Sequence, residues 1–166
     1  RATPQELVEY AAAIGMQTIA ITDHDNARGS RLARSLVEKL KLTLIPAIEM
    51  TCRWDLSQAA PGKADIDVLG YYLDLDQPDL HSFEAALLDD IYERIDIACW
   101  YLSAEGYTIS LQDVLQVNPY CAGIHPLLVA VLQMGYASSH DRALELIDKI
   151  WQNVRPSSFT IDQVIA

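Results

Sequence analysis

The chain has 166 residues, of which 51% are apolar, and a formal net charge of −11 at pH 7. This length fits one compact domain, or a core with a small accessory unit, and the apolar content excludes general disorder. Because an acidic surface repels phosphates, no extended nucleic-acid surface is expected, and a site that handles phosphates would have to recruit them through bound cations.

The cysteines and the hydropathy pattern indicate a cytoplasmic protein. Cys52, Cys99 and Cys121 are odd in number and widely spaced, without a CxxC motif, which is typical of a reducing compartment. No apolar run approaches the roughly 20 residues that cross a bilayer. No signal peptide is visible either, since the chain opens directly on a helix start. We therefore expect no membrane partner.

The first fifty residues alternate helical and strand patterns. Thr3 and Glu6 form a capping-box pattern around a proline at the first helical position, and Gly15 marks the end of that helix. The expected elements are a helix over 4–14, a strand over 18–21, a helix over 28–40 and a strand over 42–50 that Pro46 interrupts. This order predicts a parallel α/β architecture with right-handed crossovers.

The remainder of the chain reads as a loop, a third strand and then helices. We expect a loop over 51–65, a strand over 66–73, helices over 80–104, 110–117, 124–134 and 139–152, and a last short helix. Ser110 is expected to cap the helix over 110–117, and Thr160 the last short helix. The predicted organisation is therefore an α/β part over 1–78 followed by a helical subdomain over 79–155.

Ligand-type side chains occur at the ends of the predicted strands. Asp23, His24 and Asp25 follow the first strand, Glu49 lies at the end of the second, and Asp67 lies within the third. In a parallel α/β fold, ligands bind at the carboxyl ends of the strands. One imidazole with several carboxylates suits Mn²⁺, Zn²⁺ or Fe²⁺. A carboxylate that bridges two such ions would let them polarise a phosphate and generate hydroxide.

Each candidate also has a purely structural interpretation. The acidic tripeptide with Asn26 and Gly29 fits a loop and helix cap as well as a metal site. Glu49 favours function, because a carboxylate inside an apolar strand is costly unless it is paired or bound to a metal. Asp67 fits a solvated edge strand equally well, and His125, before Pro126, fits a turn residue. His81 and His140 are expected to be solvated.

Several segments together resemble the PHP family, the polymerase and histidinol phosphatase domain. They are "TPQELVEYAAAIGMQTIAITDHDNARG", "LIPAIEMT" and "DVLGYYLD". The later segments "ERIDIACWYLSAEGYTISLQDV" and "AGIHPLLVAVLQMGYASSHDRAL" are more loosely similar to the insertion of its phosphoesterase branch. The resemblance implies part of a distorted (β/α)₇ TIM-like barrel with a helical insertion, with residues 156–166 starting the return to the barrel.

The resemblance also implies the chemistry and its residues. Family members bind two or three divalent ions (Mn²⁺, Zn²⁺, Fe²⁺ or Mg²⁺) and hydrolyse phosphoesters such as histidinol phosphate, nucleoside bisphosphates and short oligonucleotides. His24 matches a metal-binding histidine, Glu49 a metal-bridging glutamate, and Asp23 and Asp25 match positions that support the site. The implied catalytic set is thus Asp23, His24 and Glu49, the implied metal ligands are His24, Glu49 and Asp67, and His125 is the candidate for substrate binding.

The chain departs from the family pattern in four places. The HxH strand and its following aspartate are expected before Arg1, and the His-Pro and Asp-x-His segments beyond Ala166. Asp67 stands where the family usually has histidine. Gly123-Ile124-His125-Pro126 replaces Gly-Arg-Pro-His, so the arginine that would hold a phosphate is missing and the histidine is displaced.

Two hypotheses follow. In the first, the chain is the middle of a metal-dependent phosphoesterase that acts on a nucleotide, a nucleoside bisphosphate or a short oligonucleotide through metal-activated water. In the second, it is a degenerate, non-catalytic module with an interaction or regulatory role, which Asp67 and Ile124 favour.

Overall fold

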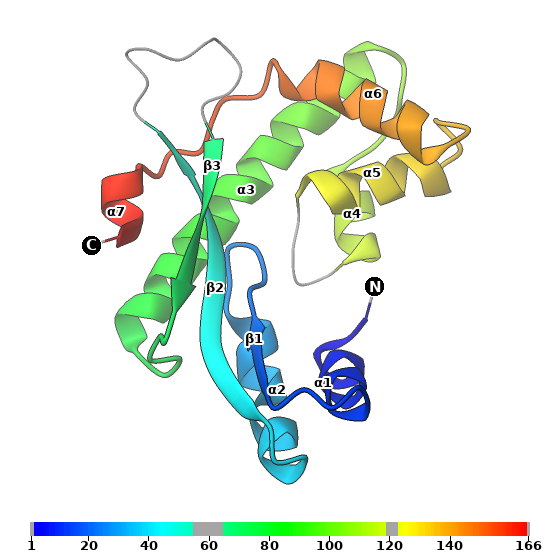
Figure 1. The fold of residues 1–166 in the computed structure, drawn as a ribbon. Helices are drawn as coiled ribbons and strands as arrows, with labels where there is room; N and C mark the ends of the chain where they lie inside the picture. The colour runs from blue at the N-terminus through cyan, green and yellow to red at the C-terminus, as the bar shows by residue number, and fades with distance from the viewer. Residues whose placement is uncertain (1, 55–64, 119–122, 166) are drawn as a thin grey trace.

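A computed structural model describes residues 2–54, 65–118 and 123–165. Every helix and strand expected from the sequence is present, with ends shifted by at most a few residues. The elements are α1 (Pro4–Ala13), β1 (Thr18–Ile21), α2 (Arg28–Lys39), β2 (Thr43–Arg53), β3 (Asp65–Tyr71), α3 (Pro78–Ala104), α4 (Leu111–Val117), α5 (Ile124–Gln133), α6 (His140–Trp151) and α7 (Ile161–Ile165). The fold is therefore mixed α/β (Figure 1).

The three strands form one sheet in the order β1-β2-β3. β1 pairs with β2 in parallel, as predicted, whereas β3 pairs with β2 antiparallel. The parallel architecture predicted from the first fifty residues is therefore confirmed for β1 and β2 and does not extend to β3. Only residues 54–64 connect β2 to β3, and a parallel crossover needs a dozen residues or more, usually with a helix.

Strand β2 is longer than the sequence suggested. It continues through Pro46, which lies opposite Ile21 at the end of β1, where the missing N–H of proline costs little. β2 also runs on to Arg53, so the loop predicted from residue 51 is wrong for its first three residues. Residues 55–64 of that predicted loop lie outside the described residues. The extension gives β3 a partner along its whole length.

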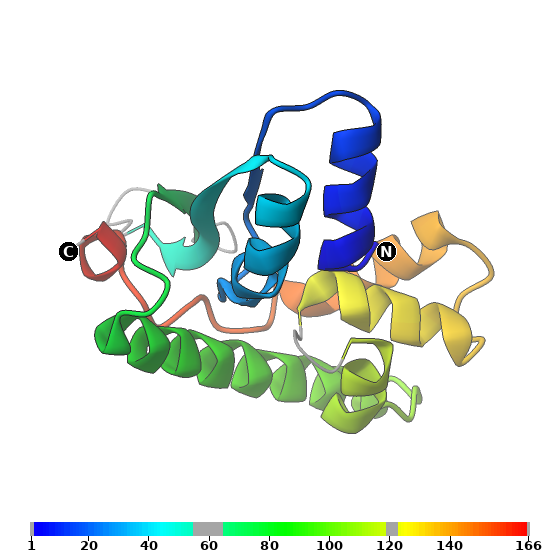
Figure 2. The same cartoon turned by 90° about the horizontal axis from the view of Figure 1, so that it is seen from below.

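Helix α3 runs past both the sheet and the helical part of the molecule (Figure 2), and it contributes to two apolar cores. Its first half packs against the sheet through Leu87, which contacts a cluster containing Ile48 and Met50. Its second half packs against α4, α5 and α6 through residues such as Ile95 and Leu102. A third cluster joins α1 and α2 to β1. The 27 residues of α3 thus connect the sheet to the helical part of the molecule.

The predicted helix caps are confirmed at two places. Thr3 and Glu6 form a capping box at α1, and Ser110 and Asp113 form another at α4. The hydrogen bonds from Ser110 lower the pKa of the Asp113 carboxyl. Each box satisfies backbone N–H groups that the first helical turn leaves without intrahelical partners.

A buried ionic cluster joins α3 to β3 and to the segment after α6. Arg94 on α3 is 2% exposed and forms an ion pair with Asp65. Its Nε donates to the carbonyl of Arg155 at 3.2 Å, and its guanidinium lies 5.1 Å from the centre of the Trp151 ring. Asp90, also buried, accepts from Arg155 at 2.7 Å. The cluster therefore fixes the start of β3 against the helical part.

No helix in the described parts of the chain is long and apolar enough to span a membrane.

Candidate metal centre

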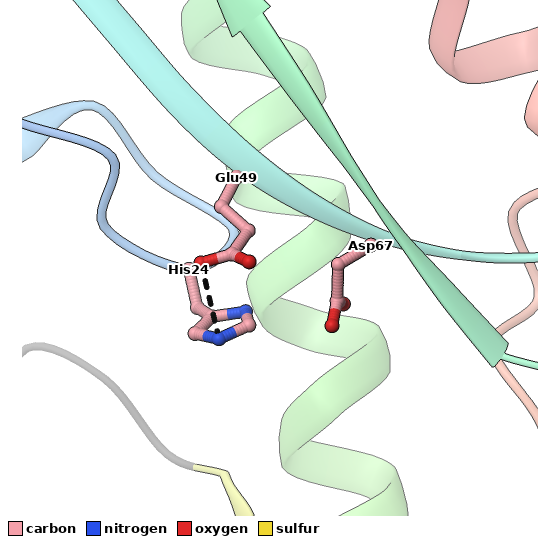
Figure 3. Close-up of side chains that lie close together, drawn as sticks. All are labelled: His24, Glu49 and Asp67. Carbon is pink, nitrogen blue, oxygen red and sulfur yellow. Dashed lines mark ion pairs between the residues drawn. The ribbon is translucent and has the colours of Figure 1, made fainter.

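His24 and Glu49 are brought together by an extension of the parallel pairing of β1 and β2. The Asp25 N–H donates to the Glu49 carbonyl at 2.7 Å, and the Glu49 N–H donates to the Asp23 carbonyl at 3.1 Å. His24 is thereby in register with Glu49, and residues in register project their side chains from the same face. The His24 Nε2 lies 3.3 Å from the Glu49 carboxylate, drawn as a dashed line in Figure 3.

Asp67 reaches the same place from β3, across the antiparallel ladder. It lies opposite Thr51, two residues beyond Glu49 on β2, so Glu49, Thr51 and Asp67 share one face of the sheet. One ligand atom from each of His24, Glu49 and Asp67 lies within 4.8 Å of the others. Figure 3 shows the three side chains converging from the loop after β1, from β2 and from β3. All three residues were candidate ligands in the sequence analysis, but the antiparallel pairing that brings Asp67 to the site was not predicted.

Asp25, the residue after His24, is buried and 4% exposed. Its φ of 59° is in the left-handed region, which aspartate tolerates better than most residues. Its carboxylate accepts from the Thr51 N–H at 2.9 Å. Burial raises the pKa of Asp25 to about 6, against the lowering effect of that hydrogen bond. Asp25 therefore connects the loop to β2 rather than joining the three converging side chains.

Asp23 serves the helix that follows. Its Oδ2 accepts from the Gly29 N–H at 3.1 Å, in the first turn of α2. Asn26 accepts from the Arg28 N–H at 3.1 Å and donates to the His24 carbonyl at 2.9 Å. Asp23 and Asn26 thus accept hydrogen bonds at the start of α2, as in the turn interpretation, but the N-cap of α2 is Ala27, which has no side-chain cap hydrogen bond. His24 faces Glu49.

Glu84 on α3 also holds the loop between β1 and α2 in place. No role was predicted for this residue from the sequence. It is 6% exposed, accepts from the Ala27 N–H at 2.6 Å and pairs with Arg31 at 2.8 Å. A buried carboxylate is stable only with such partners. The sequence offers one indication of this role, which is that Glu84 lies in the first two turns of a helix whose apolar face packs against the sheet.

A pocket of about 530 Å³ borders the cluster. Asp23 and His24 form part of its wall, with Arg28 at the start of α2 and Asn118 after α4. Apolar side chains supply much of the remainder. His24 thus belongs both to the cluster and to the pocket wall, and Arg28 places a cationic side chain in the same wall.

The other histidines do not join the cluster. His81 and His140 have side chains that are 51% and 62% exposed, as predicted. His125 is exposed in the first turn of α5. Among the described residues, the group of possible metal ligands contains only His24, Glu49 and Asp67, so the role of His125 in substrate binding stays a prediction.

The donor set fits a divalent ion. Two carboxylates balance the charge of such an ion, and an imidazole nitrogen favours Mn²⁺, Zn²⁺ or Fe²⁺ over Ca²⁺. Three protein ligands also leave a coordination position open, as catalytic metal sites require. With the His24 side chain 52% exposed, that position would face solvent and the pocket.

Comparisons with known proteins concern the fold and part of the sequence. No protein-family model matches the chain. Over 85 residues the chain is 32% identical to the 5′-3′ exoribonuclease Rnm of Salmonella typhimurium, and equally to Rnm of Escherichia coli. Each match covers 50% of this chain and 27% of the relative, so the match spans about a quarter of the length of these curated relatives.

Two solved structures share the fold. One is a protein described as a metal-dependent phosphoesterase from Bifidobacterium adolescentis, with a TM-score of 0.79, 23% identity, and coverage of 99% of this chain and 57% of the other. The second is an amidohydrolase from Chromobacterium violaceum, with a TM-score of 0.72, 19% identity, and coverage of 86% and 49%. The chain therefore has a fold that occurs in proteins described as hydrolases.

Proposed function

We propose that this chain contributes to the metal centre of a PHP-type phosphoesterase that hydrolyses a small phosphorylated substrate. The observation that carries the proposal is the convergence of His24, Glu49 and Asp67 from three separate segments to within 4.8 Å. The shared fold with a protein described as a metal-dependent phosphoesterase supports it. The TIM-like barrel of that family is part of the proposal.

The residues of this chain have distinct proposed roles. A divalent ion held by His24, Glu49 and Asp67 would polarise a phosphoryl oxygen and lower the pKa of a water molecule. His24 supplies a nitrogen donor, and the two carboxylates hold the positive charge. Asp23 and Asp25 position the loop that carries His24, through the Gly29 N–H and the Thr51 N–H.

The charge and the pocket favour a small substrate. A net charge of −11 disfavours long polyanions, whereas a cation at the cluster would attract a single phosphate. The pocket of about 530 Å³ offers room beside His24, with Arg28 in its wall. The partial likeness to the exoribonuclease Rnm supports a nucleotide or a short oligonucleotide as the substrate class.

Metal titration combined with a phosphatase assay tests the proposal. We expect the purified protein to bind Mn²⁺ in calorimetry and to hydrolyse p-nitrophenyl phosphate, bis-p-nitrophenyl phosphate or a short oligoribonucleotide. Glu49→Gln keeps the side-chain shape and removes the charge, so it should weaken Mn²⁺ binding by more than about 100-fold, beyond the loss typical of residues that only support a ligand. Glu38→Gln, at an exposed position of α2, is the matched control.

Two outcomes decide against the proposal. If the folded wild-type protein binds neither Mn²⁺ nor Zn²⁺, the hypothesis of a non-catalytic module is favoured. Asp67 and Ile124, which replace the family residues, are the sequence features that support that hypothesis. Equal Mn²⁺ affinity in the Glu49→Gln and Glu38→Gln variants would place the metal elsewhere in the molecule.

A further inference from the structure

We infer that Thr51 is a positioning residue of the metal centre, which holds the Asp67 carboxylate in place for metal binding. The inference rests on the proposed function of the cluster. Neither the spacing of the acidic residues nor the resemblance pointed to Thr51. Its signal in the sequence is the strand alternation, which puts Thr51 on the same face of β2 as Glu49.

The hydroxyl of Thr51 holds Asp67 directly. The Thr51 Oγ1 donates to the Asp67 Oδ1 at 3.0 Å, between two residues that lie opposite each other in the β2–β3 ladder. A carboxylate accepts through two oxygens with about four lone pairs, so this bond leaves capacity for a cation. Asp67 is exposed and would otherwise sample several rotamers, which weakens a metal site.

The repulsion between carboxylates makes this restraint necessary. Asp67 is the diagonal neighbour of Glu49 on the same face of the sheet, and their ligand atoms lie within 4.8 Å. In the metal-free protein, two negative charges at this distance repel each other. A hydroxyl donor opposite Asp67 opposes that repulsion and keeps the carboxylate beside His24.

Thr51 is itself fixed from its backbone. Its N–H donates to the buried Asp25 at 2.9 Å, and its carbonyl accepts from the hydroxyl of Ser157 at 3.1 Å. Ser157 is 1% exposed, and its N–H donates at 2.9 Å to Asp65, the ion-pair partner of Arg94. Thr51 therefore links the exposed Asp67 to the buried ionic cluster through a chain of hydrogen bonds.

Calorimetric titration with Mn²⁺ of Thr51→Val and Thr51→Ser tests the inference. Valine keeps the β-branched shape and removes only the hydroxyl, and the loss of such a supporting hydrogen bond typically weakens metal affinity by about 10- to 100-fold. Serine retains the hydroxyl and should restore the affinity to within about threefold of wild type. Equal affinity of Thr51→Val and wild type, or equal losses in the two variants, would overturn the inference.

A double-mutant cycle separates positioning from a general structural effect. If Thr51 acts through Asp67, Thr51→Val should change the Mn²⁺ affinity by less than about threefold once Asp67→Asn is present, because the two effects are coupled. Additive losses would instead assign Thr51 a structural role independent of Asp67 and would contradict the inference.

Metal-free crystal structures keep this inference distinguishable from the proposed function. In wild type and Thr51→Ser, Asp67 should stay within hydrogen-bond distance of residue 51, whereas in Thr51→Val it should adopt another rotamer. If the wild-type protein binds no metal and Asp67 still moves in Thr51→Val, the proposed function fails and the positioning of Asp67 by Thr51 stands. An unmoved Asp67 in Thr51→Val rejects the inference whatever the metal titration gives.

Discussion

At the scale of single residues, hydrogen-bond partners separate side chains that the sequence presents as one acidic run. Asp23 accepts from Gly29 in α2 and Asp25 from the Thr51 N–H, while His24 faces the Glu49 carboxylate. The same tripeptide thus contains an acceptor for the first turn of α2, a buried support and a candidate ligand. The turn interpretation therefore describes Asp23, whereas the metal-site interpretation of His24 stays a prediction.

Cys99 allows a test of burial at this scale. It is 4% exposed in the core of the helical part, and burial, with Asp96 and Asp113 adding to it, raises its pKa to about 12 from 9.0. Because the thiolate is the reactive form, iodoacetamide at pH 8 should leave native Cys99 unmodified. Peptide mapping by mass spectrometry measures this, with the guanidinium-unfolded protein as the reactive control.

The raised pKa of Cys99 also determines the direction in which the stability of the fold changes with pH. The folded state favours the neutral thiol, so the contribution of Cys99 to stability is complete below pH 9. Above pH 9 it is lost by at most about 1.4 kcal/mol for each pH unit, as the thiol ionises in the unfolded chain first. Stoichiometric alkylation of Cys99 itself in the native protein at pH 8 would contradict its burial.

At the scale of elements, the junction of β1 and α2 depends on the absence of a side chain at residue 29. A Cβ at Gly29 would overlap the Asp23 carboxylate and lie 2.9 Å from a methyl of Ile21. Gly29→Ala would otherwise favour a helix by up to about 1 kcal/mol. We expect the overlap to dominate, with a net loss of about 1–3 kcal/mol in the free energy of unfolding.

Urea denaturation of Gly29→Ala and of Ser35→Ala measures this effect. Ser35 is exposed on the same helix, so alanine there should change the free energy of unfolding by no more than about 0.5 kcal/mol. A Gly29→Ala variant as stable as wild type would mean that Asp23 moves away from α2 at little cost.

At the scale of the whole molecule, the sheet and the helical part share α3 and the buried Arg94 cluster. Arg94→Met would remove the ion-pair partner of Asp65 and a more distant partner of Asp90, at 3.9 Å, while Asp90 would keep Arg155. The removal of one partner of a buried ion pair typically costs about 3–5 kcal/mol. We expect the melting temperature to fall by roughly 6–20 °C, at about 2–4 °C for each kcal/mol in a chain of this size.

Calorimetry of Arg94→Met beside Arg142→Met checks this expectation. Arg142 also forms an ion pair, with Glu145, but both side chains are more than 60% exposed, so its loss should cost less than about 1 kcal/mol. Similar melting temperatures for the two variants would show that the buried cluster does not stabilise the fold. The division into parts at residues 78 and 155 stays a prediction, which limited proteolysis can test.

The sequence by itself determined the order and type of the elements, because their signals are local. Capping residues such as Thr3 and Ser110 define helix starts, and an unbroken apolar run defines β1. It also identified His24, Glu49 and Asp67 as candidate ligands, since they follow or interrupt apolar strands and carry metal-binding side chains.

Only the tertiary structure decided how these residues meet. The antiparallel return of β3 aligns Asp67 with Thr51, and register between strands depends on pairing that no local pattern specifies. Arg94 and Glu84 occupy helical positions that resemble a solvated face, yet they are buried because their partners come from residues 65 and 27. Local signals fix what each segment forms, whereas long-range hydrogen bonds and charge pairs fix which side chains form the site.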